Sequence, residues 1–292
     1  MKKFRFILIA LLFLCINQLI AQDDVKKDSA WTKGGDVSLV FSQVSLSNWS
    51  AGGENSLATN AFFNYFANYK KDSWIWDNKF EFAFGLQKQG EQSLRKSDDK
   101  LYFKTTAGKE LKNHWYFTGS FDFKSQFAKG YNYPNDVDVI SKLFAPAYIT
   151  FATGFQYKKT DAFVFNVSPV AGKLTVVGDE DLSNAGAFGV TPGSKTKWEL
   201  GASINLLIKK EIMKNVELKS NLDLFSAYTN NPEYIDVNWE VFINMKVNEY
   251  ITTTFTTHLI YDHDIMIADE NNVMEPRVQF KELFGVGISY NF

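Results

Sequence analysis

Long segments of this chain alternate apolar and polar residues with a period of two. In residues 195–210, Trp198, Ile204 and their every-second neighbours are apolar, and the residues between them are mostly polar or small. The same alternation recurs at 74–88, 115–128 and 236–248. A period of two places successive side chains on opposite faces of a β-strand. The pattern therefore predicts an all-β protein.

The length of these segments indicates which kind of all-β protein. Ordinary strands have about 5–6 residues, whereas these segments have on the order of 10–14. At about 3.3 Å per residue and a tilt near 40°, twelve residues rise about 30 Å, which covers an outer-membrane apolar band of about 25 Å. A soluble sandwich would also alternate, but its strands need not be this long. The length favours strands that span a membrane.

The connections between the segments alternate in length. Strands are expected at 37–47, 55–69, 74–88, 99–110, 115–128, 147–158, 162–173, 195–210, 216–228, 236–248, 251–262 and 278–292. The longer connections are 89–98, 129–146, 174–194 and 263–277, and the tight ones lie at 70–73, 112–114, 158–161 and 248–250. Short periplasmic turns alternating with long outer loops are typical of transmembrane barrels. We expect a transmembrane antiparallel up-and-down β-barrel of twelve strands in the outer membrane of a Gram-negative cell.

The first residues have the features of a secretory signal. Lys2, Lys3 and Arg5 precede an apolar run over 6–16, and a cleavage site is expected after Ala21. The expected domains are therefore a signal peptide at 1–21, a short periplasmic segment at 22–35 and the barrel at 36–292. The single cysteine, Cys15, lies in the signal, so no disulfide or thiolate metal site is expected after cleavage.

Loss of the signal also changes the charge. It removes three positive charges and no negative ones, which takes the formal net charge from −2 to −5. A mildly acidic protein is a poor partner for nucleic acid, so none is expected. The expected partners are outer-membrane lipid, the barrel-insertion machinery, and small solutes or glycans at the outer loops.

The alternation continues to the last residue. Val286, Ile288, Tyr290 and Phe292 form an apolar stripe with no polar tail after it. In a closed barrel the last strand pairs with the first and leaves no free edge. Phe292 would then lie at the periplasmic interface, in an aromatic belt. Tyr290 and Phe292 also resemble the C-terminal signal that outer-membrane barrels present to their insertion machinery.

The polar face of the strands is expected to line the barrel interior. The candidate lumen-lining residues are Lys79, Glu81, Asp122, Lys124, Lys197, Glu199, Glu240, Lys246 and His258. Their charges are mixed in sign, which argues against strong ion selectivity. Two interpretations stay open: a channel or binding barrel for a small solute, and a structural or surface-interaction barrel with a plugged lumen.

The outer loops contain the remaining candidates for binding. Asn48, Trp49 and Glu54 surround a Gly-Gly turn and could contact a glycan or another ligand. Acidic residues recur in later loops, at Asp179, Asp181, Asp262 and Asp264. Their oxygens could bind calcium, but no complete calcium-loop spacing is present, so solvated loop charge is the simpler interpretation. No metal or cofactor is assigned.

An outer-membrane lipid hydrolase is the least favoured alternative. Such an enzyme would need a nucleophilic serine beside a histidine. The three histidines are His114, in an expected turn, His258, on the polar face, and His263, at the start of a loop. None has an evident serine partner on the same face, so the chain is not expected to be an enzyme.

Several motifs resemble a Bacteroidota outer-membrane family catalogued as domain of unknown function 3078. They are SQVSLSNWSAGGENS (42–56), KLFAPAYITFATGFQYK (142–158), SPVAGKL (168–174), AFGV (187–190), LFSAY (224–228) and IYDHD (260–264). The resemblance implies a signal peptide and an outer-membrane barrel. It implies no reaction.

Overall fold

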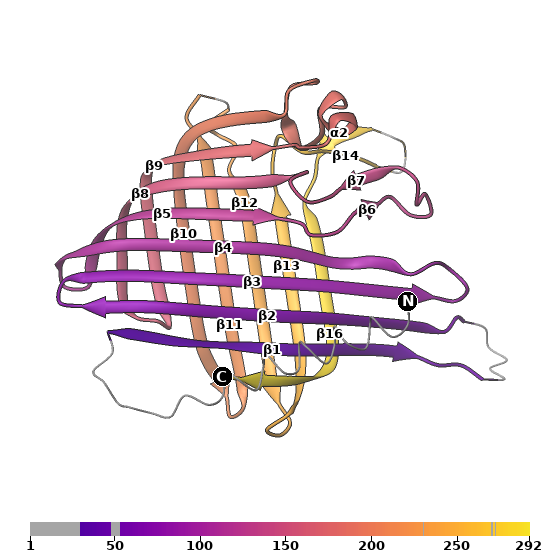
Figure 1. Ribbon diagram of the computed structural model, residues 1–292, viewed down its shortest axis with the longest axis horizontal. Helices are drawn as coiled ribbons and strands as arrows, with labels where there is room; N and C mark the ends of the chain where they lie inside the picture. Colours follow the sequence, from indigo (N-terminus) through magenta and orange to yellow (C-terminus); the bar gives the residue numbers. More distant parts are fainter. Residues whose placement is uncertain (1–29, 48–52, 230, 270, 272) are drawn as a thin grey trace, which may run out of the picture. The chain divides into compact units, whose positions relative to one another are not determined.

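The structure, a computed structural model, describes residues 30–47, 53–229, 231–269, 271 and 273–292. The expected signal peptide at 1–21 and most of the segment at 22–35 lie outside these residues. The compact unit Trp31–Phe292 is a closed barrel in which every strand pairs with two antiparallel neighbours. Around the barrel the strand order is β1-β16-β13-β12-β11-β10-β9-β8-β5-β4-β3-β2 (Figure 1).

Twelve long strands form the wall, as the alternation predicts. Their bounds are β1 Trp31–Val44, β2 Ser56–Lys71, β3 Trp74–Gln89, β4 Arg95–Lys112, β5 Trp115–Ser125, β8 Ala147–Thr160, β9 Phe163–Val176, β10 Thr196–Met213, β11 Val216–Ala227, β12 Asp236–Lys246, β13 Ile251–Tyr261 and β16 Gln279–Asn291. The predicted all-β barrel is thus confirmed. The first strand begins at Trp31, earlier than the start at 37 and the domain boundary at 36 that we expected from the sequence.

The barrel closes between its first and last strands. Asp36 of β1 pairs with Asn291 of β16, and the register continues to Phe41 opposite Val286. The Gly35 amide donates to the Phe292 carbonyl at 2.9 Å, and the Phe292 amide donates back to the Gly35 carbonyl at 3.0 Å. The last residue is therefore part of the wall.

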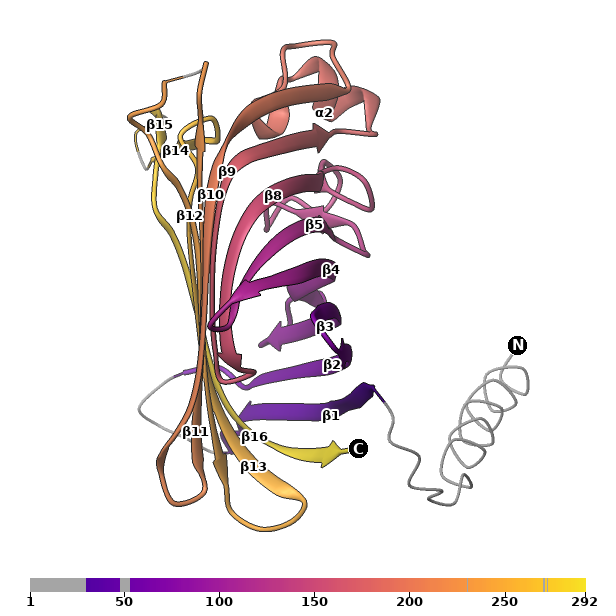
Figure 2. The same ribbon diagram turned by 90° about the vertical axis from the view of Figure 1, so that its left-hand side faces the viewer.

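The barrel has two facing walls, and their strands run in clearly different directions. β1–β5 and β8 form one wall, and β10–β13 form the facing wall (Figures 1 and 2). Two glycines lie where neighbouring strands come unusually close: a Cβ at Gly154 would lie 2.1 Å from the Val167 carbonyl oxygen, and one at Gly201 would lie 2.0 Å from that of Ser226. A side chain at either position would collide with backbone, so the local bend of the wall requires glycine.

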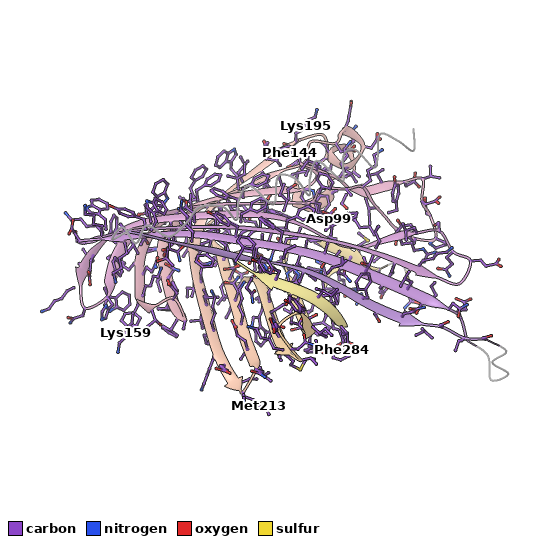
Figure 3. The ribbon with its side chains drawn as sticks, turned by 60° about the horizontal axis from the view of Figure 1, so that its bottom comes forward. Asp99, Phe144, Lys159, Lys195, Met213 and Phe284 are labelled. Atoms are coloured by element: carbon purple, nitrogen blue, oxygen red, sulfur yellow. The ribbon has the colours of Figure 1, made fainter. Side chains whose placement is uncertain are left out.

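The outer face of the wall is apolar along every strand. Trp198 is 66% exposed and Phe284 is 62% exposed, and Figure 3 shows Phe284 on β16 among the side chains that project from the strands. Outward indole groups find partners within the wall: Trp76 Nε1 donates to Thr105 Oγ1 at 2.8 Å and Trp239 Nε1 to Ser220 Oγ at 2.9 Å. Side-to-side pairing of this kind suits a surface that meets lipid, which offers no hydrogen bonds.

The long loops contain small elements that the sequence pattern does not predict. They are β6 Gly130–Tyr131, β7 Val139–Ser141, the helix α2 Glu180–Asn184, the 3₁₀ turn η1 Ala187–Gly189, β14 Met266–Ala268 and β15 Met274–Pro276. Ala145, Val177 and Val190 are buried together beneath Leu182 and Phe188, which gives the 177–195 loop a hydrophobic core of its own. Within the described residues, no helix has the length and apolar character needed to cross a membrane.

Candidate functional site

Side chains from opposite walls meet inside the barrel at mid-height. Glu81 of β3 lies 2.6 Å from Lys79, 2.8 Å from Lys100 of β4 and 3.1 Å from Lys219 of β11. Lys100 also reaches Glu240 of β12, at 2.7 Å. We call Lys79, Glu81, Lys100, Lys219 and Glu240 the mid-barrel cluster. It joins strands of both walls across the interior.

A second set of polar contacts extends this cluster. Tyr102 Oη donates to Asp122 Oδ1 at 2.8 Å, and Lys104 lies 3.3 Å from the same carboxylate. On the facing wall, Asp223 accepts hydrogen bonds from the side-chain amides of Asn205, Asn221 and Asn238. Lys104 Nζ lies 3.4 Å from Asn205 Oδ1 and so links the two walls a second time.

Carboxylates outnumber lysines at the long-loop end of the interior. Lys173 lies 2.6 Å from Asp236, 3.2 Å from Asp262 and 3.8 Å from Glu199. Lys197 lies 3.1 Å from Glu199 and forms a further ion pair with Asp264. We call Lys173, Lys197, Glu199, Asp236, Asp262 and Asp264 the vestibule cluster. Its formal charge is two positive against four negative, an excess of two negative charges.

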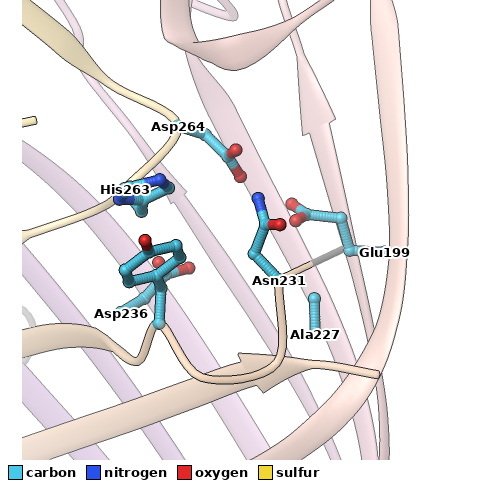
Figure 4. A pocket seen from close by; sticks show the side chains of 7 residues that line it. Glu199, Ala227, Asn231, Asp236, His263 and Asp264 are labelled. Carbon is cyan, nitrogen blue, oxygen red and sulfur yellow. The ribbon is translucent and has the colours of Figure 1, made fainter. Parts of the chain in front are cut away.

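A small pocket opens beside the vestibule cluster (Figure 4). Its cavity volume is about 10 Å³, and it is lined by Glu199, Ala227, Asn231, Tyr234, Asp236, His263 and Asp264. The side chains of Asp264, Asn231 and Glu199 point toward one another, and the His263 ring stacks on the Tyr234 ring at 3.6 Å between centroids. The pocket thus combines carboxylates, an amide and an aromatic pair.

Of the residues expected to line the lumen, most belong to these two clusters. Glu81 and Glu240 are in the mid-barrel cluster with Lys79, Asp122 is in the polar set beside it, and Lys197 and Glu199 are in the vestibule cluster. Lys124 Nζ lies 5.9 Å from the centre of the Tyr102 ring. His258 Nε2 is 2.7 Å from Asn238 Oδ1 and 3.7 Å from Glu240. Lys246 is exposed at the end of β12.

The outer-loop candidates that the structure describes do not form a single site. Asn48 and Trp49 lie outside the described residues. Glu54 is exposed in the β1–β2 loop, close to Gly90, and Asp181 is exposed in α2. Asp262 and Asp264 pair with lysines of the interior instead of standing free in a loop. In the described part of the chain, no group of three or more His, Cys, Asp or Glu side chains is arranged to hold a metal ion.

Asp179 has a structural role at the start of α2. It pairs with Lys142, and its Oδ1 accepts a hydrogen bond from the Leu182 amide at 2.9 Å, as an N-cap residue does. The hydrogen bond from Lys142, with that amide, holds the pKa of the Asp179 carboxyl below its usual value. The contact ties the loop before β8 to the loop after β9.

The remaining candidates lie at the short-turn end and around the histidines. Tyr290 and Phe292 stack at 6.4 Å between ring centroids on the outer surface. His263 Nδ1 lies 3.4 Å from Tyr261 Oη, and in the described part of the chain neither His258 nor His263 has a serine as a hydrogen-bond partner. The arrangement that acyl transfer would need at these two residues is thus not seen in that part of the chain.

Sequence reasoning missed several residues that matter here. Lys100 makes two of the contacts that cross or flank the interior, and Tyr102, Asn205 and Asn238 complete the polar set. Lys173 of β9 contacts three carboxylates. An inward position in the alternation would have selected all five of these residues, but only distances across the barrel show which ones meet.

A closed antiparallel barrel with an apolar outer face and a charged interior defines the class: this is a transmembrane β-barrel of the outer-membrane type. The model of a family described as "Protein of unknown function (DUF3078)" matches residues 41–131, which include the SQVSLSNWSAGGENS motif and support the family resemblance. The other motifs lie beyond the matched range. The search of curated proteins returned no match.

Solved structures give distant matches over most of the chain. An outer-membrane channel from Pseudomonas putida F1 has a TM-score of 0.39 and 12% identity, covering 92% of this chain and 99% of that one. The translocator domain of the autotransporter NalP from Neisseria meningitidis has a TM-score of 0.38 and 7% identity, covering 92% and 90%. OmpT, an outer-membrane protein of Vibrio cholerae, has a TM-score of 0.32 and 10% identity, covering 92% and 100%.

Proposed function

We propose that this protein is an outer-membrane barrel that binds small cationic solutes at its outer mouth and does not pass them freely. The observation that carries the proposal is the contact of Lys100 with both Glu81 and Glu240, which connects the two walls at mid-height. Above it, the vestibule cluster carries an excess of carboxylates and borders a pocket. An acidic mouth raises the local concentration of cations. The contacts across the middle of the barrel would keep these cations from passing through.

Single-channel conductance tests whether the barrel is closed at the mid-barrel cluster. Wild-type protein in a planar bilayer is expected to give no discrete steps, because the mid-barrel cluster connects the two walls across the interior. A triple variant with Glu81→Ala, Lys100→Ala and Glu240→Ala removes both signs of charge together and is expected to give steps. Lys246→Ala is the control, since this lysine is exposed at the end of β12. Discrete conductance steps from the wild-type barrel would contradict closure at the mid-barrel cluster and favour a solute channel.

Ligand binding tests the vestibule. Calorimetry with ethanolammonium is expected to show binding that falls in Asp236→Asn with Asp264→Asn, since both carboxylates belong to the vestibule cluster. Glycerol, which is similar in size and uncharged, should bind more weakly. Glu180→Gln with Asp181→Asn, both exposed in α2, serves as the charge-matched control. Equal binding of the two probes, or equal loss in the control, would contradict a cation site.

Location, export and lineage belong to the same proposal. We infer a Gram-negative outer membrane, a cleaved signal at 1–21, insertion guided by Tyr290 and Phe292, and a Bacteroidota origin. The apolar outer surface and the resemblance to the family support this. The folded protein should fractionate with outer membranes and migrate differently on a gel before and after boiling.

A structural barrel whose loops meet glycans or proteins is the second candidate. The compact core of the 177–195 loop favours it, because a folded loop offers a defined surface. A silent bilayer together with no cation binding at the vestibule would select this candidate. Lipid hydrolysis lost in His258→Ala would instead select the hydrolase.

A further inference from the structure

The membrane-facing wall contains an apolar groove across β3, β4, β5, β8 and β9. The groove has a volume of about 710 Å³, and its lining includes Trp76, Ala107, Gly119, Phe121, Phe151 and Gly172. These five strands are consecutive neighbours in the wall (Figure 1). The groove lies on the outer face and is independent of the barrel interior.

The strand register explains the floor of this groove. Trp76 pairs with Ala107, Ala107 with Gly119, Gly119 with Thr153, and Thr153 with Val170. The central three positions of this row are small, and a Cβ built on Gly119 would meet no atom within 4 Å. The side chains of the outer face therefore project least where this row crosses β4, β5 and β8.

Aromatic pairs border the row on both sides. Toward the long-loop end, Phe121 and Phe151 contact each other at 5.1 Å between ring centroids. Toward the short turns, Phe117 and Phe155 do so at 5.9 Å. Phe117 and Phe151 are each about half exposed, so the rings rise above the floor. The result is a trough with small residues along its base and rings along its edges.

The position and chemistry of the trough identify its occupant. It is continuous with the apolar outer face, so membrane lipid is the medium that reaches it. The Trp76 indole N–H at one end already donates to Thr105 Oγ1, at 2.8 Å. The remaining lining is overwhelmingly apolar, which excludes a charged ligand. A narrow, flexible, apolar group fits between the two rows of rings, and an acyl chain has this shape.

We propose that the trough is a binding site for one acyl chain of a membrane lipid. Strands of such barrels tilt by about 35–45°, so a trough that runs across them is inclined through the apolar band and can follow a chain that descends from the headgroup region. The bound chain fills the depression above Gly119 and contacts Phe121 and Phe151. Lipid in this site exchanges more slowly than lipid elsewhere around the barrel.

Lipid retention tests the proposal. Wild-type protein, partly delipidated in mild detergent, is expected to keep one lipid molecule in native mass spectrometry. Gly119→Leu fills the floor at a position where a Cβ meets no atom within 4 Å, and it should lose that molecule. Ala202→Leu adds the same side chain outward on β10 of the other wall and should keep it. Thr153→Leu fills the same floor from β8 and provides a second variant if Gly119→Leu does not fold.

Two results would overturn the site. One is equal lipid retention in Ala202→Leu and in a folded floor variant, Gly119→Leu or Thr153→Leu. Folding of the floor variant is checked by its altered gel migration before boiling. The other is a wild-type dimer without lipid that Gly119→Leu or Thr153→Leu converts to monomer, because the occupant would then be a second copy of the chain. Neither result depends on cation binding at the vestibule cluster or on closure at the mid-barrel cluster.

Discussion

Lys100 of β4 and Glu240 of β12 are 140 positions apart in the chain and 2.7 Å apart in the folded barrel. Their contact crosses the interior, and the same lysine lies 2.8 Å from Glu81. Both side chains are largely shielded, with about a fifth of each accessible. A single lysine thus bridges two carboxylates that belong to opposite walls.

Loss of this lysine should weaken the barrel. Lys100→Met keeps much of the apolar stem but leaves Glu240 without its closest cation, and we expect the free energy of unfolding to fall by roughly 2 kcal/mol. Urea unfolding followed by tryptophan fluorescence measures the change. Lys246→Met, at the exposed end of β12, should leave the midpoint almost unchanged. Equal midpoints for the two variants would contradict a stabilising role for the cross-barrel contact.

The outward face of β10 should respond to charge according to depth. Ile204 lies in the middle of the strand and Met213 at its short-turn end, as Figure 3 shows for Met213. An arginine facing lipid near the midplane costs about 2–4 kcal/mol, and one near the interface about 0–1 kcal/mol. Ile204→Arg should therefore destabilise the barrel in liposomes far more than Met213→Arg does. The reverse order would place the apolar band elsewhere on the strand.

The bend at Gly154 should tolerate no side chain. Gly154→Ala would place a methyl group 2.1 Å from the Val167 carbonyl oxygen, a clash with backbone that only a shift of β9 can relieve. Overpacking of this kind typically costs about 1–3 kcal/mol. Gly119→Ala on the neighbouring strand meets open space and is the matched control. The fraction that migrates as folded barrel without boiling should fall only in the first variant.

Acid should loosen the 177–195 loop. Lys142 and the Leu182 amide lower the pKa of the Asp179 carboxyl. Near this pKa, the folded loop therefore binds fewer protons at Asp179 than the unfolded loop does. The stabilisation is present above the ordinary pKa of 3.8 and is lost as the pH falls through the lowered folded value. Cleavage of the loop by an acid-active protease should accelerate there, and Asp179→Asn should be cleaved readily at neutral pH.

Asp181→Asn gives the contrast for that experiment, since its side chain is exposed in the same short helix. It should keep the slow cleavage of the wild type at neutral pH. If both variants were cleaved alike, the ion pair with Lys142 would not be what holds the loop.

The strands could be predicted because their signal is local. Inward and outward positions alternate through β16 and through β10 as far as Glu211, and each of the twelve predicted strands overlaps an observed one. The first strand was expected too late, because Gly34 and Gly35 interrupt its apolar stripe although they pair with Phe66 and Tyr65. The pairing of Lys173 with Asp236 and Asp262 could not be predicted, because it depends on how closely the walls approach and on where a loop returns.

The cross-barrel contacts also imply an order of events when the protein reaches its membrane. Lys100 is made long before Glu240, so for much of synthesis the lysines of β3 and β4 have no partner on the facing wall. Glu81 is made together with them, whereas Glu240 arrives only with the second half of the chain. The contact between Lys100 and Glu240 can therefore form only after both walls of the barrel have been made.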